Sequence, residues 1–328
     1  MLEGSVIIMK AVVLKNTCKA EDLKVSEVDI PQVKDDWVLV KIIGFGINRS
    51  EVILRDYEAD EDYIKLPVIP GIECAGEIVD ESSTDFSKGD KIVALMGGMG
   101  RSFDGSYAEY ALLPQKNVFK IPDDAFNHLS IEEIIAVPET YFTSYGSIST
   151  LNLTDKDTLL VRGATSATGL TAMQLASAIG CRIIATSRDE KRFEKLKDYG
   201  ADECIVDNGD LSSQISCNKV LELIGPKTLP DSLTLLEENG ICCVTGILGG
   251  IEYLDGFDPI KYMYNKYMTS FFSNFPTQEI IDEIFEFIIK HDIKPAIGKV
   301  FTSLEDIPKA HLLMQSNNAQ GKIIFRLI

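Results

Sequence analysis

The chain has 328 residues, enough for two domains with separate cores, and 45% of them are hydrophobic and 25% charged. Its formal net charge is −18, from 50 acidic and 32 basic residues, which argues against nucleic acid or an anionic membrane surface as a partner. The sequence has no run that approaches the roughly 20 apolar residues of a transmembrane helix.

The first eight residues are too short for a signal peptide and lack its positive start. Because the sequence from Met9 looks like a natural start, we expect residues 1–8 to be an extension or an alternative start. The seven cysteines are scattered and none forms a C-x-x-C pair. This pattern favours reduced thiols in a cytoplasmic protein over disulfides or a structural metal site.

Residues 9–131 contain short β-like runs separated by turn residues, a pattern that predicts an antiparallel, barrel-like domain. The runs are Lys10–Leu14, Val38–Gly44, Ala75–Val79, Lys91–Ala94 and Tyr107–Leu113. Ser130 and Glu133 form a capping box. We expect it to begin a helix that continues into the next domain.

From residue 132 the pattern changes to alternating strands and helices, which predicts a parallel sheet of the dinucleotide-binding type. The strand candidates are Thr158–Arg162, Arg182–Thr186, Glu203–Val206, Lys219–Leu223, Ile241–Thr245 and Met268–Phe272.

The turn after the first of these strands carries the strongest functional signal. Its residues are all small: Gly163, Ala164, Thr165, Ser166, Ala167, Thr168 and Gly169. A strand, such a turn, a helix and a second strand within about thirty residues fit a dinucleotide-binding unit. Small side chains let the backbone approach a pyrophosphate, whose charge is met by the free N–H groups of a helix start. Because Ala164 and Ser166 replace two glycines of G-x-G-x-x-G, a turn that binds nothing is the alternative.

The tail alternates again, as helix Gln278–Lys290, strand Lys299–Phe301, helix Ile307–Met314 and strand Lys322–Phe325. We expect it to return to the first domain. The predicted organisation is therefore one domain of residues 9–131 and 273–328, and a second domain of residues 132–272.

These segments, in this order, resemble the medium-chain dehydrogenase/reductase superfamily, with a likeness to its quinone oxidoreductase branch. The passages that carry the resemblance, beside the turn, are Gly44–Glu51, Pro67–Ile78, Gly105–Tyr110 and Pro138–Gly146. The resemblance implies an α/β fold, with a Rossmann doubly wound parallel sheet and a GroES-like, mostly antiparallel β-barrel domain.

The chain departs from the zinc alcohol dehydrogenases of this superfamily, whose metal is held by a cysteine in the first passage and a histidine in the second. By resemblance, the cysteine position corresponds to Ile47 or Asn48 in this chain, and the histidine position corresponds to Ile72. A catalytic zinc needs about three converging N, S or O ligands, and Glu73 by itself cannot hold the ion. We expect no metal.

The cofactor is predicted to be NADPH. NAD-specific enzymes carry an acidic residue about twenty positions past the glycine turn. Here that position is Ser187, followed by Arg188 and then Lys191. A hydroxyl and two cations suit the 2′-phosphate of NADPH. The alternative is an ordinary solvated helix start, because Asp189 and Glu190 follow closely.

Without a metal, the protein must position an acceptor and stabilise the negative charge that hydride creates. Quinones and enones delocalise that charge themselves, so we expect a quinone or activated enone as substrate. Asn48 is the candidate catalytic donor and cofactor contact, and a turn-stabilising asparagine is its alternative. By family position, Thr143 is placed beside the nicotinamide, and Thr245 and Gly246 lie in the loop over it.

Two further expectations concern surfaces. Tyr57, Tyr63 and Tyr141 are candidates to line a substrate cleft, with core or rim positions as the alternative. The segment Tyr267–Ser273 is predicted to be an apolar edge strand that pairs with a second subunit, as is common in the family, giving a homodimer.

The expected activity is therefore zinc-independent hydride transfer from NADPH to a quinone or activated enone. A 2-alkenal or enoyl reductase is the alternative enzyme. A non-catalytic NADPH-binding sensor or structural protein is the alternative from another class.

Overall fold

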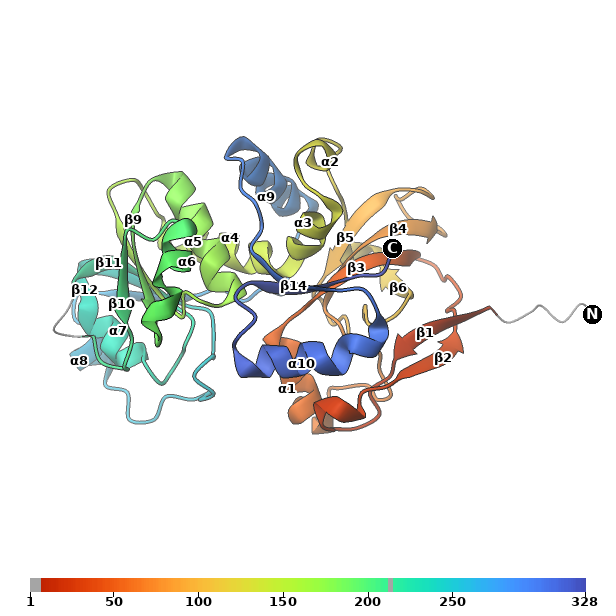
Figure 1. Cartoon of the computed structure of the whole chain (residues 1–328), viewed down its shortest axis with the longest axis horizontal. Coiled ribbons are helices and arrows are strands. Elements are labelled where there is room, and N and C mark those ends of the chain that lie inside the picture. The colour runs from red at the N-terminus through yellow and green to blue at the C-terminus, as the bar shows by residue number, and fades with distance from the viewer. Residues whose placement is uncertain (1–6, 212–214) are drawn as a thin grey trace, which may run out of the picture. The chain divides into compact units, whose positions relative to one another are not determined.

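The structure, a computed structural model, describes residues 7–211 and 215–328 (Figure 1). The chain divides into two compact units. We call residues 1–139 together with Asn274–Ile328 unit 1, and Thr140–Ser273 unit 2. From the sequence we place the same boundaries at residues 131–132 and 272–273.

Unit 1 is built on a mixed sheet whose strands follow the order β14-β15-β3-β4-β5-β7, with β6 also paired to β3. Neighbouring strands are antiparallel except β14 and β15, which are parallel. A separate antiparallel ribbon joins β1 and β2. The bounds are β1 Ile8–Val12, β2 Val25–Asp29, β3 Trp37–Ile47, β4 Glu73–Asp80, β5 Lys91–Leu95, β6 Tyr110–Pro114, β7 Val118–Lys120, β14 Ile297–Phe301 and β15 Lys322–Arg326.

The C-terminal tail does return to the first domain. Strand β15 pairs with β3 in antiparallel register, with Ile323 opposite Ile47 and Ile324 opposite Gly46. This pairing brings Lys322, at the start of β15, to the end of β3 that precedes Asn48. The register therefore joins residues that are 274 positions apart in the chain.

The helices of unit 1 are α1 Arg49–Asp56, α2 Ala125–His128, α3 Ile131–Ala136, α9 Gln278–Lys290 and α10 Ile307–Ser316. The predicted capping box is present, since the N–H of Ser130 donates to Glu133 (2.7 Å) and the N–H of Glu133 donates to Ser130 Oγ (3.3 Å). We expected this helix to continue into the next domain, but it does not. It ends at Ala136, and α4 (Pro138–Leu151) begins at a proline, which cannot donate to the helical ladder.

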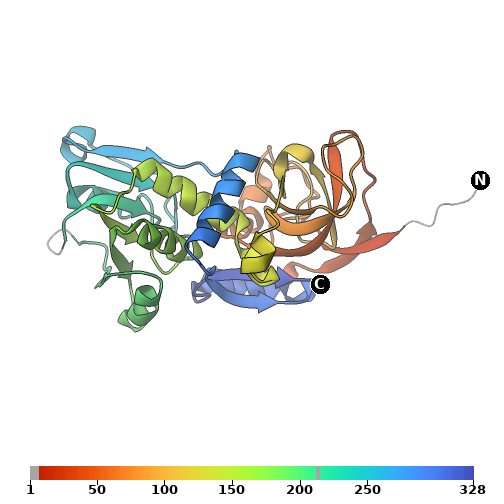
Figure 2. The same ribbon diagram turned by 90° about the horizontal axis from the view of Figure 1, so that it is seen from above.

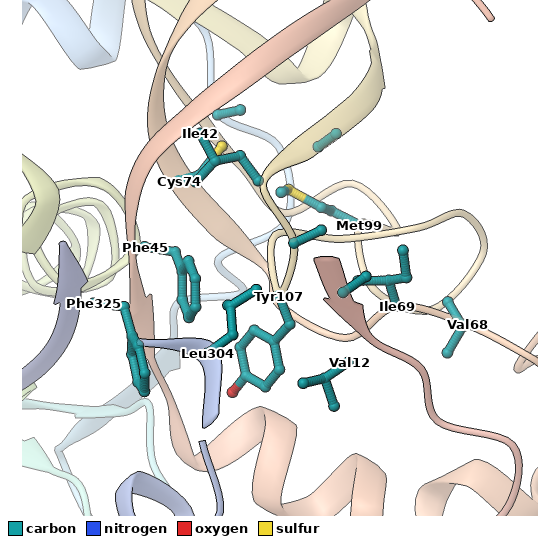
Figure 3. Close-up of a cluster of buried hydrophobic side chains, with 14 of the residues drawn as sticks. Val12, Ile42, Phe45, Val68, Ile69, Cys74, Met99, Tyr107, Leu304 and Phe325 are labelled. Atoms are coloured by element: carbon teal, nitrogen blue, oxygen red, sulfur yellow. The ribbon is translucent and has the colours of Figure 1, made fainter. Parts of the chain in front are cut away.

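A stack of aromatic rings lies in the core of unit 1, and Figure 3 shows its members. The ring centroid of Phe45 is 4.9 Å from that of Phe325 and 5.1 Å from that of Tyr107. Tyr107 also contacts a buried polar group formed by His311 and Arg55. Its hydroxyl lies 3.0 Å from His311 Nε2. Nδ1 of the same ring lies 3.1 Å from Nη1 of Arg55. A guanidinium only donates, so His311 Nδ1 accepts and its proton is on Nε2.

The described residues of unit 2 form a six-stranded parallel sheet in the order β10-β9-β8-β11-β12-β13. This order is that of a Rossmann sheet, as predicted. The strands are β8 Thr158–Arg162, β9 Arg182–Ser187, β10 Glu203–Val206, β11 Cys217–Glu222, β12 Leu236–Val244 and β13 Tyr267–Ser270. Helix α5 packs on β8 and β9, and α7 packs on β11 and β12 (Figures 1 and 2). The remaining bounds are α5 Ala167–Ile179, α6 Phe193–Asp198, α7 Leu229–Leu235 and α8 Pro259–Tyr262.

Strand β13 is the edge of this sheet and carries exposed apolar side chains. The exposed fractions are 59% for Tyr267, 46% for Met268 and 72% for Phe272, just after the strand. Phe271 instead turns inward, with its ring centroid 5.4 Å from that of Phe142. Across the described part of the chain, no helix is long and apolar enough to span a bilayer.

Candidate active site

The turn between β8 and α5 has the geometry of an anion site. Gly163 adopts a φ of 86°, in the left-handed region that favours glycine. Ser166 caps α5, because its Oγ accepts the N–H of Gly169 at 3.0 Å. A Cβ on Gly169 would overlap the backbone of the turn. The amides of Ala167 and Thr168 have no acceptor within the described residues, so they are free to donate to a phosphate.

The end of β9 carries no carboxylate. Ser187 is buried, and its hydroxyl donates to the carbonyl of Asp189 (3.0 Å) and accepts the N–H of the same residue (3.1 Å). The side chains of Arg188 and Lys191 are exposed, and neither makes an ion pair with any described residue. The carboxylate of Asp189 instead accepts the N–H of Lys191 at 3.0 Å. Two cations that form no ion pair with the described residues therefore follow the strand, at the position where the sequence predicts the 2′-phosphate contact.

Three further predicted cofactor residues come together at the carboxyl end of β12. Ser147 of α4 donates to the carbonyl of Thr143 (2.7 Å), and its hydroxyl lies 2.8 Å from that of Thr245. Gly246 follows directly, and a Cβ there would overlap the carbonyl of Leu223. These residues and the β8–α5 turn all follow the carboxyl ends of parallel strands or pack against them. This is the edge at which open α/β sheets bind ligands.

Unit 1 contains the remaining predicted site residue, Asn48, in a buried polar cluster. Asn48 is the N-cap residue of α1 and is 9% exposed. Its Nδ2 donates to Glu73 Oε1 (2.9 Å), and its Oδ1 accepts from Lys322 Nζ (2.5 Å). Lys322 Nζ also lies 2.5 Å from Glu73 Oε1 and 3.8 Å from Glu139 Oε2. The other oxygen of Glu73 accepts the N–H of Glu139 at 2.8 Å.

Glu51 links the two passages that carry the family resemblance in unit 1. Its Oε2 accepts the N–H of Asn48 (2.8 Å), and its Oε1 accepts the N–H of Ile72 (3.1 Å). Burial raises the pKa of Glu51 to about 7, although the ammonium of Lys322 acts in the opposite direction. A carboxyl group that changes charge near neutral pH is therefore in direct contact with Asn48.

The three candidate tyrosines differ in their surroundings. Tyr141 is fully buried and its hydroxyl lies 3.3 Å from Gln174 Oε1, so it is a core residue and not part of a cleft wall. Tyr57 and Tyr63 are exposed, and the hydroxyl of Tyr63 donates to Glu58 at 2.9 Å. The exposed pair keeps its candidate role and Tyr141 loses it.

Comparison with known proteins gives the family. A zinc-binding dehydrogenase family model matches residues 167–290, and an alcohol dehydrogenase GroES-like domain model matches residues 34–123. A human quinone oxidoreductase is 28% identical over 318 residues, which cover 92% of this chain and 92% of that protein. The chain belongs to the medium-chain dehydrogenase/reductase superfamily. Its relatives place it in the quinone oxidoreductase-like branch, as the sequence passages predict.

Other similar proteins differ in their named activity, and solved structures with this fold include one with NAD bound and one with NADPH. An acryloyl-coenzyme A reductase of Metallosphaera sedula is 24% identical, over 96% of this chain and 99% of its own. A Coxiella burnetii quinone oxidoreductase has a TM-score of 0.84 at 19% identity, covering 98% of this chain and 100% of its own. A mycobacterial protein solved with NADPH has a TM-score of 0.83 at 22% identity, covering 97% and 99%. The superfamily fold supports a nicotinamide cofactor for this chain.

The family name of one matching model implies zinc, but the donor set of this chain does not fit it. The positions that resemble the metal ligands are Ile47 or Asn48 and Ile72, which offer buried aliphatic side chains and one amide. Glu73 is already bound to the ammonium of Lys322. Within the described residues, no three His, Cys, Asp or Glu side chains are grouped as a metal site would require.

Sequence reasoning did not single out Glu51 and Lys322, which contact Asn48 in the buried polar cluster of unit 1. Glu51 had a signal, since Asn48 and Glu51 stand in the N-cap and N3 spacing of a capping box. Lys322 had none, because a lysine at the start of a short strand is usually solvated. Its burial, with 2% of its surface exposed, follows from the register between β15 and β3.

Proposed function

We propose that this chain is a zinc-independent reductase that transfers hydride from NADPH to a quinone or an activated enone. The observation that carries the proposal is the buried cluster of Asn48, Glu73 and Lys322, in which the Asn48 amide and the Lys322 ammonium hold the carboxylate of Glu73, so that it is not left free for a metal. An acceptor that depends on a Lewis acid would gain nothing from this cluster. An acceptor that delocalises its own negative charge needs only positioning and a hydrogen-bond donor.

NADPH, when bound, supplies the hydride, and the residues of the protein bind the cofactor and donate a hydrogen bond to the acceptor. In unit 2, the amides at the start of α5 bind the pyrophosphate, and Arg188 and Lys191 bind the 2′-phosphate. The exposure of these two cations and the absence of a carboxylate from β9 support NADPH over NADH. In unit 1, Asn48 donates to the oxygen on which negative charge develops. Solvent provides the proton that completes the reduction.

A second enzyme activity, reduction of a 2-alkenal or an enoyl thioester, has its own support. One relative is named an acryloyl-coenzyme A reductase, and it spans nearly the whole chain. This chemistry needs the same hydride donor and the same donor to a developing enolate oxygen. The two activities differ in the cleft that receives the acceptor.

We also propose a homodimer that acts in the cytoplasm. Ten of the large hydrophobic side chains exposed in the described residues lie between positions 247 and 275. Three of them, Tyr267, Met268 and Phe272, lie on or next to β13, and a second copy that pairs with this free edge would cover them. The seven free cysteines agree with a reducing compartment.

A steady-state screen of NADPH oxidation against quinones, enones, 2-alkenals and enoyl thioesters tests the proposed activity. We expect turnover with quinones or enones and a lower kcat/KM with simple ketones. Turnover confined to the thioester would identify the enoyl reductase. Quenching of NADPH fluorescence without oxidation by any acceptor would identify a binding protein and exclude the reductase.

A further inference from the structure

The ammonium of Lys322 is buried and has three oxygen atoms of neighbouring side chains around it. Its Nζ lies 2.5 Å from Glu73 Oε1, 2.5 Å from Asn48 Oδ1 and 3.8 Å from Glu139 Oε2. The lysine is 2% exposed and Glu73 is 0% exposed. The space for this contact depends on Gly46, since a Cβ there would overlap both Glu73 Oε1 and Cε of Lys322.

Lys322 stays charged in this position. Burial by itself would lower its pKa, but the carboxylates of Glu73 and Glu139 raise it above the ordinary value. A buried ammonium with two carboxylates and an amide oxygen around it is satisfied, whereas the same carboxylates without it would be buried and uncompensated.

The charge of Lys322 decides how the amide of Asn48 is oriented. An ammonium has three donors and no acceptor, so the atom of Asn48 that faces it must be the oxygen. The amide nitrogen then faces the carboxylates. One of its N–H groups donates to Glu73 at 2.9 Å, while the other has only a long contact of 3.5 Å with Glu51 Oε1. This second N–H is the group left for an acceptor outside the cluster.

We propose that Lys322 is the positioning residue of the active site, which holds the Asn48 amide so that one N–H is presented to the substrate oxygen. The proposal rests on the proposed function, because it assigns Lys322 a role through Asn48. A purely structural role, in which Lys322 only neutralises Glu73, makes different predictions for the variants below.

The kinetic test is a double-mutant cycle of Lys322→Met and Asn48→Ala, with kcat, quinone KM and NADPH Kd measured for each variant. Without the ammonium, the Asn48 amide is free to flip its oxygen and nitrogen. Lys322→Met should therefore lower kcat roughly ten- to a hundredfold and leave the NADPH Kd within about twofold. Lys322→Arg, which keeps the charge and donors, should recover part of kcat. In the Asn48→Ala background, Lys322→Met should have no further effect on kcat.

Matched variants separate positioning from charge balance and from misfolding. Lys299→Met makes the same change at an exposed lysine of β14 and should leave kcat unchanged. Lys322→Met combined with Glu73→Gln removes both buried charges, so it should recover the melting temperature lost in Lys322→Met. If the double variant recovers kcat as well, or if the losses from Lys322→Met and Asn48→Ala simply add, Lys322 does not act through Asn48.

A measurement without turnover keeps this proposal distinct from the proposed function. The side-chain NH₂ signals of Asn48 can be assigned in ¹⁵N-labelled protein as those missing from Asn48→Ala. In wild type we expect two resolved protons that exchange slowly, and in Lys322→Met a faster exchange and a changed shift. Unchanged signals in Lys322→Met would overturn the positioning role. Inactivity of the wild type towards every acceptor would overturn the proposed function instead, while this arm still applies.

Discussion

The guanidinium of Arg162 binds the carboxylate of Asp207 through two hydrogen bonds, Nε to Oδ2 at 2.8 Å and Nη2 to Oδ1 at 2.9 Å. Arg162 ends β8 and Asp207 follows β10, and β9 lies between these strands in the sheet. The ion pair therefore passes over the carboxyl end of β9, where Thr186 donates to Asp207 at 3.3 Å. It fixes the edge of the sheet from which both the β8–α5 turn and the segment after Ser187 emerge.

This buried pair is compensated on all sides. Burial would raise the pKa of Asp207, but the bonds from Arg162 bring it below the ordinary value. A second carboxylate, Asp231, accepts from Nη1 of Arg162 at 2.6 Å. Because removing one partner of such a group would leave uncompensated charge in the interior, we expect Arg162 to govern the stability of unit 2.

The first prediction concerns cofactor preference. Arg188→Ala should raise the KM for NADPH by about one to two orders of magnitude and leave the KM for NADH nearly unchanged. The reason is that one charged hydrogen bond to the 2′-phosphate contributes roughly 1.5–3 kcal/mol. Steady-state kinetics with both cofactors measures the change. Arg182→Ala, at the opposite end of β9, is the control. Equal losses with NADPH and NADH would show that Arg188 is structural.

The second prediction concerns metal content. Protein purified without added zinc should contain far less than one zinc per chain by elemental analysis, since Ile72 and the Ile47–Asn48 pair stand at the positions that resemble the zinc ligands. Activity should survive treatment with a chelator. Stoichiometric zinc that resists the chelator, together with activity that disappears when it is removed, would contradict the prediction.

The third prediction concerns the subunit interface. Thr269→Pro removes a backbone donor from β13 and should convert a dimer into monomers, as measured by sedimentation. Phe272→Asp places a charge on a side chain that is 72% exposed, without changing a backbone donor, and should have the same effect. Circular dichroism must first show that both variants are folded. Folded variants that sediment as the wild-type dimer would place the interface elsewhere, and a monomeric wild type would exclude the dimer.

The fourth prediction concerns Glu51 and alkaline pH. Its folded-state pKa of about 7 lies above the ordinary 4.5, so it contributes stability below pH 4.5 that is lost as the pH rises through 7. The loss amounts to about 3 kcal/mol in unfolding free energy. Glu51→Gln remains neutral, so its melting temperature relative to wild type should increase between pH 4.5 and pH 8. Glu21→Gln, at an exposed carboxylate, is the control. A difference that is constant across this range would show that Glu51 is charged throughout.

The fifth prediction concerns His311 and acid. Burial, and secondarily the Arg55 guanidinium, lower the pKa of His311 to about 3, below the ordinary 6.5. The neutral ring therefore contributes stability above pH 6.5 that is lost as the pH falls towards 3, about 2 kcal/mol of it by pH 5. Urea unfolding of wild type and His311→Gln at pH 7 and pH 5 measures the contribution.

From pH 7 to pH 5, we expect the free energy of unfolding to fall more for wild type than for His311→Gln. The comparison of variants is needed because Glu51 changes stability in the opposite direction over the same range. An equal fall in both proteins would mean that His311 takes up its proton in the folded state at its ordinary pKa.

The local elements of this protein are determined by its sequence. Strands β8 and β10 and helix α9 have the bounds that the sequence predicts, because apolar runs of strand length and a helical period are set by neighbouring residues. The capping box of Ser130 and Glu133 is equally local. The β8–α5 turn is local as well, since its small residues are consecutive in the sequence, and its cofactor role stays a prediction. The sequence prediction missed the break before Pro138, although the proline itself indicates it, and it gave no element for β2, β7 or α1.

The buried cluster of unit 1 was decided by the tertiary structure. Lys322 reaches Asn48 because β15 pairs with β3 in one register, and a shift by a single residue would turn it to the other face of the sheet. The pairing of Arg162 with Asp207 likewise requires the strand order of unit 2. Charges this deep persist only when partners from distant segments surround them. A one-dimensional pattern reveals the residue types, but the fold determines which of them meet.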